Sequence, residues 1–446
     1  MKETYTVKEK IKQFLHILFP IFLTQISLYM MNFFDVTMTG KYSAVDLAGV
    51  AIGSNIWIAI STGIGGILTG LTPIVSQAFG AKDHERISQT VEQAIYLAIV
   101  FAFSVFALIY FFVPILLENM PIEHHVQIVA YQYLQALCIG IVPIFIYHVL
   151  RSFIDALGRT NVTMMLTLCS LPLNILLNDI FIFGRWGIPA FGGVGAGYAT
   201  SITYWCLLLC AFLLVRFRKP FATYNILKKL HPISFSIWKQ LFLIGTPIGL
   251  AIFFETSIFS AVTLLMSQFG TATIAAHQAA LNFASLLYMI PLSVSLTLTI
   301  IVGFEVGAKR FEHAKRYCII GISSAVMMAI VVSIVLLLFR ESIASLYTND
   351  ALVLQWTKRF LLYVLFFQFS DAVAAPIQGA LRGYKDVRFP FFIALVSYWL
   401  IGLPVGYVFT HYTTAGPFGY WLGLIAGLAS GAILLFIRLI QKWKHA

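Results

Sequence analysis

The chain has 446 residues, of which 60% are hydrophobic and only 11% are charged, and its mean hydropathy is +0.88. Soluble domains carry about 25% charged residues, so this composition excludes a water-soluble globular protein. The net charge of +11 would suggest a nucleic-acid partner in a soluble chain. In this chain, membrane topology explains the positive net charge, and we expect no nucleic-acid partner.

Apolar stretches follow one another along the whole chain. Each is long enough to cross a hydrocarbon core about 30 Å thick as a helix of about 20 residues. Polar residues separate twelve predicted helices, at 13–36, 47–78, 90–117, 127–150, 162–182, 192–215, 237–267, 273–305, 317–339, 354–380, 389–410 and 417–438. We therefore predict an all-α integral membrane protein with 12 transmembrane helices.

The distribution of basic residues predicts the orientation. With the amino terminus inside, the inner segments hold 24 of the 29 Lys and Arg residues. The outer segments hold only Lys41, Arg185, Arg340, Lys358 and Arg359. Because inner loops are enriched in Lys and Arg, we predict that both termini are cytoplasmic. The inner basic residues are also expected to contact anionic membrane lipids.

The two halves of the chain resemble each other. The segment VSQAFGAKDHE at 75–85 is similar to VGFEVGAKRFE at 302–312. The offset between these two segments also relates Pro20 to Pro247. A constant offset across several helices indicates an internal repeat.

Each half has six predicted helices. Because this number is even, the chain returns to its starting side before the second half begins, so the two halves are parallel repeats. We predict two six-helix bundles related by a pseudo-two-fold axis along the membrane normal. The predicted division is an N-terminal bundle at 1–220, a cytoplasmic linker at 221–236 and a C-terminal bundle at 237–446. Two such bundles around a central cleft are typical of secondary transporters.

Three prolines lie inside predicted helices. Pro20 and Pro247 occupy equivalent places in the two halves, and Pro376 follows shortly after Asp371. Loss of the amide donor kinks a helix, so all three are hinge candidates.

Two acidic residues of the second half lie near the predicted bilayer midplane. Asp371 is about midway along the sequence between Arg359 outside and Arg382 inside. Glu255 lies far enough beyond Lys239 in its helix to reach a similar depth. A buried carboxylate is expensive there and marks a functional site by default. No basic residue is predicted at that depth, which favours a transported cation or proton as the missing charge over a carboxylate that only ties helices together.

A second polar group is predicted in the first half. Asp35 lies toward the outer end of its helix, and the spacing of Asn174 and Asn178 places them on one helix face. Asp179 points about 100° away from that face, and Thr200 could add a hydroxyl. Such oxygens suit hard cations, although the amides could instead hydrogen-bond neighbouring helices.

With these motifs the chain resembles the multidrug and toxic compound extrusion (MATE) family, in its NorM-like branch. The resemblance covers nearly the whole chain and rests on LFPIFLTQ, NFFDVTMTG, VSQAFGAK, PLNILLN, GVGAGYAT, FFETSIF, VGFEVGAK and DAVAAPIQGALRGYKD. It implies a role in cation coupling for Glu255, Tyr288 and Asp371. It also implies a second cation or proton cluster made of Asp35, Asn174, Asn178 and Thr200.

The resemblance implies export of cationic, amphipathic drugs and dyes by antiport with Na⁺ or H⁺. The chain has 39 phenylalanines, and an aromatic cleft with carboxylates suits a large apolar cation. We favour Na⁺ at the coupling residues, because oxygen-rich clusters suit a hard cation. Protons remain the alternative, since a buried carboxylate readily holds one.

We expect a monomer in the bacterial cytoplasmic membrane, with no cofactor. A lipid-linked saccharide flippase is a rival function, but its cavity should carry basic residues for phosphate. A membrane-embedded enzyme is the alternative from a different class. It would need a nucleophile, base or metal cluster at one depth, and the ten histidines are scattered.

Overall fold

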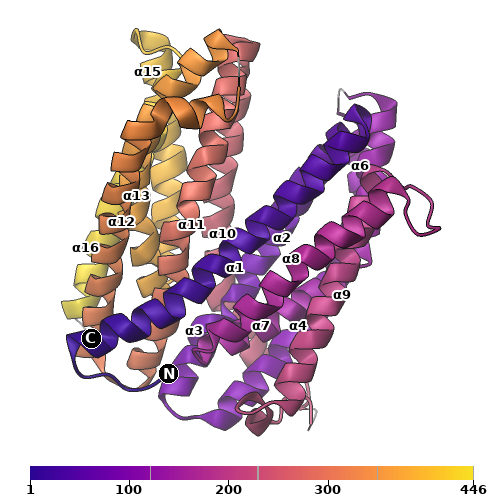
Figure 1. The fold of residues 1–446 in the computed structure, drawn as a ribbon. Coiled ribbons are helices and arrows are strands. Elements are labelled where there is room, and N and C mark those ends of the chain that lie inside the picture. Colours follow the sequence, from indigo (N-terminus) through magenta and orange to yellow (C-terminus); the bar gives the residue numbers. More distant parts are fainter. Residues whose placement is uncertain (121, 229–230, 349, 445–446) are drawn as a thin grey trace. The chain divides into compact units, whose positions relative to one another are not determined.

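The computed structural model describes residues 1–120, 122–228, 231–348 and 350–444, and in these ranges the chain forms helices joined by short connections (Figure 1). The helices of the first half are α1 Val7–Tyr42, α2 Ala44–Thr69, α3 Leu71–Gly80, α4 His84–Phe111, α5 Val113–Glu118, α6 His124–Cys138, α7 Ile141–Ala156, α8 Thr160–Phe183 and α9 Gly193–Phe217. Those of the second half are α10 Phe235–Met266, α11 Thr271–Gly307, α12 Phe311–Ser345, α13 Ala351–Gly383, α14 Arg388–Ala394, α15 Leu403–Tyr412 and α16 Phe418–Lys444. Short helical segments are η1 Phe221–Tyr224, η2 Ser267–Phe269 and the π-helical η3 Leu395–Gly402.

The spans agree with the twelve predicted helices. In the described ranges, eleven helices or continuous helix pairs are long and apolar enough to cross a membrane. The pair α6 and α7, bent by 53°, supplies a twelfth if it counts as one span. The bend falls at Gly140, where a methyl group would lie 2.9 Å from the Cα of Ser201 on α9. Close approach of α9 therefore requires glycine at this break.

The chain forms two compact units. The first unit comprises Met1 and 19–249, and the second unit comprises 2–18 and 250–446. Both divisions fall close to a proline, since Pro20 lies inside α1 and Pro247 inside α10. The units differ from the predicted bundles because the first residues of α1 pack with the second unit and the first residues of α10 pack with the first. Long-range packing, which no local pattern reveals, decides this exchange.

Glycines allow the start of α10 to pack closely in the first unit. A methyl group at Gly245 would lie 2.2 Å from the carbonyl oxygen of Ile67 on α2, and one at Gly249 would lie 2.6 Å from the carbonyl oxygen of Gly63. Backbone-to-backbone approach of this kind is typical of small residues in membrane helix packing.

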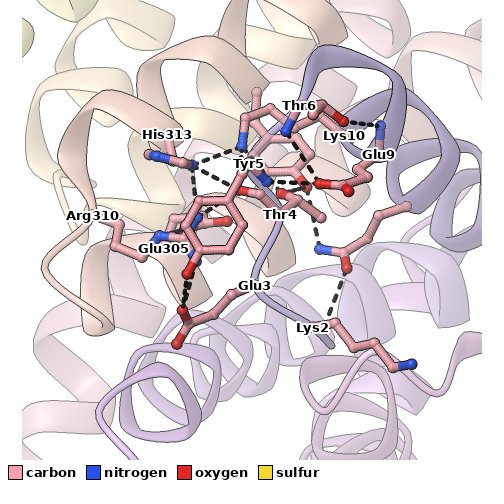
Figure 2. Close-up of polar contacts among 12 residues, drawn as sticks. Lys2, Glu3, Thr4, Tyr5, Thr6, Glu9, Lys10, Glu305, Arg310 and His313 are labelled. Carbon is pink, nitrogen blue, oxygen red and sulfur yellow. Dashed lines mark hydrogen bonds and ion pairs between the residues drawn. The ribbon is translucent and has the colours of Figure 1, made fainter.

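The amino-terminal segment is anchored in the second unit (Figure 2). The carbonyl oxygen of Thr4 accepts hydrogen bonds from Lys10 Nζ at 2.9 Å and from Arg310 Nη2 at 2.6 Å, and it lies 2.9 Å from His313 Nδ1. The Thr4 hydroxyl bonds the Tyr317 hydroxyl at 2.7 Å. Lys10 is fully buried. These contacts bind residues 2–18 to the start of α12.

The linker before α10 is anchored in the first unit in a similar way. Glu92 on α4 accepts a hydrogen bond from the Leu227 amide at 2.9 Å, and its other carboxylate oxygen lies 2.6 Å from His231 Nδ1. Gln93 accepts from the Ser234 amide and donates to the Pro232 carbonyl, each at 2.9 Å. Residues 229–230 of the predicted linker lie outside the described ranges.

The two anchors follow the internal repeat. The offset that relates Pro20 to Pro247 also relates Thr4 to His231, and it relates His84 to Phe311, the first residues of α4 and α12. Each half therefore begins with a segment held against an equivalent helix, α12 for the first half and α4 for the second. The repeat detected in the sequence is thus also visible in side-chain contacts.

Candidate functional site

The first unit holds a closed ring of polar side chains around Asp35. Asn178 Nδ2 donates to Asp35 Oδ1 at 2.6 Å, and Thr200 Oγ1 donates to Asp35 Oδ2 at 3.0 Å. Asn178 Nδ2 also donates to Asn174 Oδ1 at 3.2 Å, and Asn174 Nδ2 donates to Thr200 Oγ1 at 3.3 Å. The structure thus brings together the four residues predicted for this cluster, and all four are buried.

The local sequence explains how these helices meet. Asn174 and Asn178 share one face of α8 because they are four residues apart. The start of α9 is rich in glycine, and a methyl group at Gly195 would lie 2.5 Å from the carbonyl carbon and oxygen of Phe181 on α8. This close approach lets Thr200, further along α9, reach the carboxylate on α1.

The Asp35 cluster lacks a positive charge. In the described part of the chain, the carboxylate accepts two hydrogen bonds and forms no ion pair with Lys, Arg or His. Asn178 Oδ1 is buried and accepts no hydrogen bond from any described residue. Carboxylate and amide oxygens can hold a proton or a hard cation. Tyr133 on α6 and Tyr204 on α9 lie near enough to interact electrostatically with Asp35, and no sequence pattern indicated either residue.

The second unit holds a chain of contacts around Glu255. Glu255 Oε1 accepts a hydrogen bond from Gln378 Nε2, and Gln378 Oε1 accepts one from Arg382 Nη2 at 3.4 Å. The expectation that no basic residue serves this carboxylate was therefore wrong. The physical reason is that α13 continues to Gly383, so that Arg382 belongs to the last turn of the helix and shares a face with Gln378.

Asp371 lies in the same cluster. It is buried on α13, and in the described ranges it forms no hydrogen bond through its carboxylate and no ion pair. It interacts electrostatically with Glu255, and the half-buried Tyr288 on α11 interacts with both carboxylates. The structure thus brings together the three residues predicted for this half. Counting Arg382, the ionised cluster carries one more negative than positive charge.

Further members of the second cluster were not predicted. The side chains of Asp371, Gln378 and Arg382 share one face of α13 because positions i, i+7 and i+11 of a helix lie at nearly the same angle. That spacing could have indicated Gln378 and Arg382 from the sequence. Tyr398 interacts electrostatically with Glu255 and Asp371 from the π-helical η3, and π-helical turns often occur at functional sites. Its position depends on the helix irregularity, so no regular pattern could have found it.

Other predicted positions have simpler surroundings. Asp179 forms an ion pair with Arg185 at 2.9 Å, with about a third of its side chain exposed. It is therefore a surface residue and not part of the Asp35 cluster, as its angle on the helix indicated. Pro20, Pro247 and Pro376 lie inside continuous α-helices.

Up to twelve apolar spans and two buried clusters, each short of a positive charge, define a polytopic membrane transporter. A sequence model of the MatE family matches residues 20–180 and 247–408, so the two matches begin at the prolines that the internal repeat relates. The "Probable multidrug resistance protein NorM" of Bacillus subtilis (strain 168) is 55% identical over 445 residues, covering 100% of this chain and 98% of that protein. The protein of the same name from Bacillus licheniformis is 56% identical over 439 residues, covering 98% and 97%.

Solved structures show the same fold. The eukaryotic MATE transporter AtDTX14 superposes with a TM-score of 0.88 at 21% identity, covering 98% of this chain and 97% of that chain. The crystal structure of MATE in the straight conformation gives 0.90 at 20% identity, covering 98% and 96%. The chain therefore belongs to the MatE family of multidrug efflux transporters, and it is a transporter and not an enzyme.

Proposed function

We propose that this protein exports cationic, amphipathic drugs and dyes by antiport with Na⁺, or alternatively with H⁺. The observation that carries the proposal is the charge of the two clusters. Asp35 has no cationic partner among the described residues. In the second cluster Arg382 reaches Glu255 through Gln378, and Asp371 forms no ion pair with any described residue. Each cluster is short of one positive charge, which a monovalent coupling ion or a cationic substrate would supply.

Competition for the same negative charge provides the coupling. A ligand shifts a conformational equilibrium only by its differential affinity for the two states. A bound Na⁺ or proton neutralises a carboxylate and weakens its hold on a cationic drug, so drug release outside and ion entry become linked. Na⁺ is the favoured ion for Glu255, Asp371 and Tyr288, because their oxygens suit a hard cation.

The same proposal includes topology and location. Both termini are cytoplasmic, and the protein acts as a monomer in the bacterial plasma membrane, where its inner basic residues contact anionic lipids. The proposal keeps the division into bundles at 1–220 and 237–446 joined by a cytoplasmic linker at 221–236, with Pro20, Pro247 and Pro376 as hinge candidates. The NorM relatives carry a multidrug resistance name, which supports drug efflux over the flippase alternative.

Ethidium efflux from proteoliposomes tests this proposal. Na⁺ and pH gradients are imposed separately on the parent and on Asp35→Asn, Glu255→Gln and Asp371→Asn. Asp179→Asn is the matched control, because Asp179 forms a partly exposed ion pair outside both clusters. We expect the three cluster variants to lose gradient-driven efflux and the control to retain it. If all three variants transport like the parent under both gradients, the coupling proposal is wrong.

A further inference from the structure

A stripe of buried polar side chains runs along one face of α8 beyond the Asp35 cluster. Its members are Thr163, Thr167, Ser170, Asn174 and Asn178, all at most 4% exposed. Their spacings of three or four positions place one polar group on the same face at each turn. From the first to the last residue the stripe spans about 22 Å at 1.5 Å per residue.

A carboxylate lies at each end of this stripe. At one end Asn178 donates to Asp35, as described above. At the other end Thr163 Oγ1 donates to Asp155 Oδ1 on α7 at 2.6 Å. Asp155 is only 9% exposed. The mechanism proposed above uses Asp35 but gives no role to Asp155.

Arg151 connects Asp155 to the helix that carries Asp35. Arg151 Nε lies 3.5 Å from Asp155 Oδ2, one turn away on α7. Arg151 Nη2 donates a hydrogen bond of 3.2 Å to Gln25 Oε1 on α1. Helix α1 therefore contacts the stripe through Asp35 and contacts Arg151, the partner of Asp155, through Gln25. The stripe, both carboxylates, Arg151 and Gln25 all belong to the first unit.

The oxygens between the two carboxylates are arranged to accept protons. Thr167 and Ser170 donate their hydroxyl hydrogens to backbone carbonyls of α8, so both oxygens keep lone pairs that can accept a hydrogen bond. The Tyr147 hydroxyl lies 3.4 Å from Thr167 Oγ1. Asn178 Oδ1 is a buried acceptor that receives no hydrogen bond from the described residues. A buried acceptor of this kind indicates a missing donor, such as water.

We propose that Asp155 is a second proton-holding carboxylate of the first unit, at the far end of the α8 stripe from Asp35. The inference rests on the proposed role of Asp35 as an acceptor of the coupling ion. A proton fits this path better than Na⁺. Neighbouring side chains of the stripe are about 5–6 Å apart, which is too far to surround a metal ion but suits single bridging waters.

The proton transfer balances at every step. The protonated Asp35 carboxyl gives its proton to a water that bridges the stretch of α8 holding the Asn178 and Asn174 amides, and each water or hydroxyl oxygen beyond it passes one proton onward as it receives one. The Asp155 carboxylate accepts the last proton and becomes neutral, and release to solvent restores it. The charged group facing Asp155 is Arg151. His148 lies two turns earlier on α7, and the Met1 amino group bonds the Leu157 carbonyl at 3.2 Å. Once Asp155 is neutral, Arg151 loses its ion pair and keeps the hydrogen bond to Gln25 on α1. Arrival of the proton therefore strengthens the hydrogen bond between Arg151 and Gln25.

Drug-dependent proton flux tests the inference. The protein is reconstituted with the pH dye pyranine inside the vesicles, and ethidium is added to start exchange. We expect Asp155→Asn to lower this flux by about tenfold or more, and equilibrium ethidium binding to remain unchanged. Asp155→Glu should restore much of the flux. Thr163→Val, which keeps the ion pair with Arg151 but removes the link to the stripe, should show the same loss even if Asp155→Asn fails to fold.

Three outcomes would overturn the inference. Normal proton flux in Thr163→Val and Asp155→Asn would show that the stripe carries no protons. A parallel loss of flux and binding that Asp155→Glu does not restore would indicate a structural ion pair. A parent that moves ethidium with Na⁺ but shows no proton flux would exclude the path and leave the proposed antiport intact. A parent that shows neither ion flux would instead count against the proposed function itself.

Discussion

Asn178 on α8 donates a hydrogen bond of 2.6 Å to the Asp35 carboxylate on α1. The bond joins two helices of the first unit and belongs to the ring that Asn174 and Thr200 complete. Hydrogen bonds to an ionised group are shorter and about twice as strong as neutral ones. This contact therefore both positions the carboxylate and stabilises the packing of α1 on α8.

Removing the Asn178 amide should destabilise the first unit. Asn178→Ala leaves the buried carboxylate with Thr200 as its only donor among the described residues, and a hydrogen bond to a charged group contributes about 1.5–3 kcal/mol. We expect a lower thermal unfolding midpoint in detergent. The control is Asn119→Ala, which removes an exposed amide that bonds only the Ile115 carbonyl. Equal midpoints for both variants would contradict the role assigned to Asn178.

Gln378 should act on Glu255 together with Arg382. Gln378→Leu breaks the only described bridge between the carboxylate and the guanidinium, so we expect slower gradient-driven ethidium efflux. In a double-mutant cycle with Arg382→Gln, the two changes should be non-additive by about 0.5–3 kcal/mol, as for residues of one network. Additive effects on the initial efflux rate would mean that the bridge does not operate in the working protein.

Lys10 should anchor the amino-terminal segment to the second unit. Lys10 is fully buried and donates to both oxygens of Thr4. Lys10→Met keeps the volume but removes these donors. The Thr4 carbonyl still accepts from Arg310 and the Thr4 hydroxyl still bonds Tyr317, so the loss is the net contribution of a typical hydrogen bond, about 0.5–1.5 kcal/mol. We expect a lower unfolding midpoint than for the parent. Lys8→Met changes an exposed lysine of the same helix and should have no effect. If the two variants unfold alike, the anchor does not contribute to stability.

Gly245 should tolerate no side chain. A methyl group there would lie 2.2 Å from the Ile67 carbonyl oxygen, so Gly245→Ala must push α10 away from α2. Overpacking of this kind costs about 1–3 kcal/mol. Gly65→Ala is the matched control on α2, because a methyl group at Gly65 meets nothing within 4 Å. Gly245→Ala should lower the thermal unfolding midpoint, and Gly65→Ala should leave it unchanged. Comparable midpoints for the two variants would contradict the close approach of α10 to α2.

Local patterns predicted much of this structure. Apolar length located the spans, and the spacing of Asn174 and Asn178 placed both amides on one face of α8. The offset between the halves predicted an internal repeat, and the family matches that begin at Pro20 and Pro247 follow it. These features depend on helix periodicity and on repetition within the chain, and both can be recognised in the sequence without knowledge of tertiary contacts.

Other features depend on tertiary packing and were not predictable. Arg382 was assigned to an inner segment, since the sequence does not show that α13 continues far enough to connect it to Glu255 through Gln378. Tyr398 depends on a π-helical irregularity. The exchange of residues 2–18 into the second unit is decided by contacts with Arg310 and its neighbours, which lie in the other half of the sequence.

Ion flux driven by ethidium alone tests the central claim most directly. Proteoliposomes without any ion gradient are given an ethidium gradient, and movement of Na⁺ and H⁺ in the opposite direction is recorded. We expect the parent to move one of these ions against ethidium and Glu255→Gln and Asp371→Asn to abolish this movement. Ethidium transport by the parent without any opposing ion flux would contradict the claim that buried carboxylates couple ion entry to drug export.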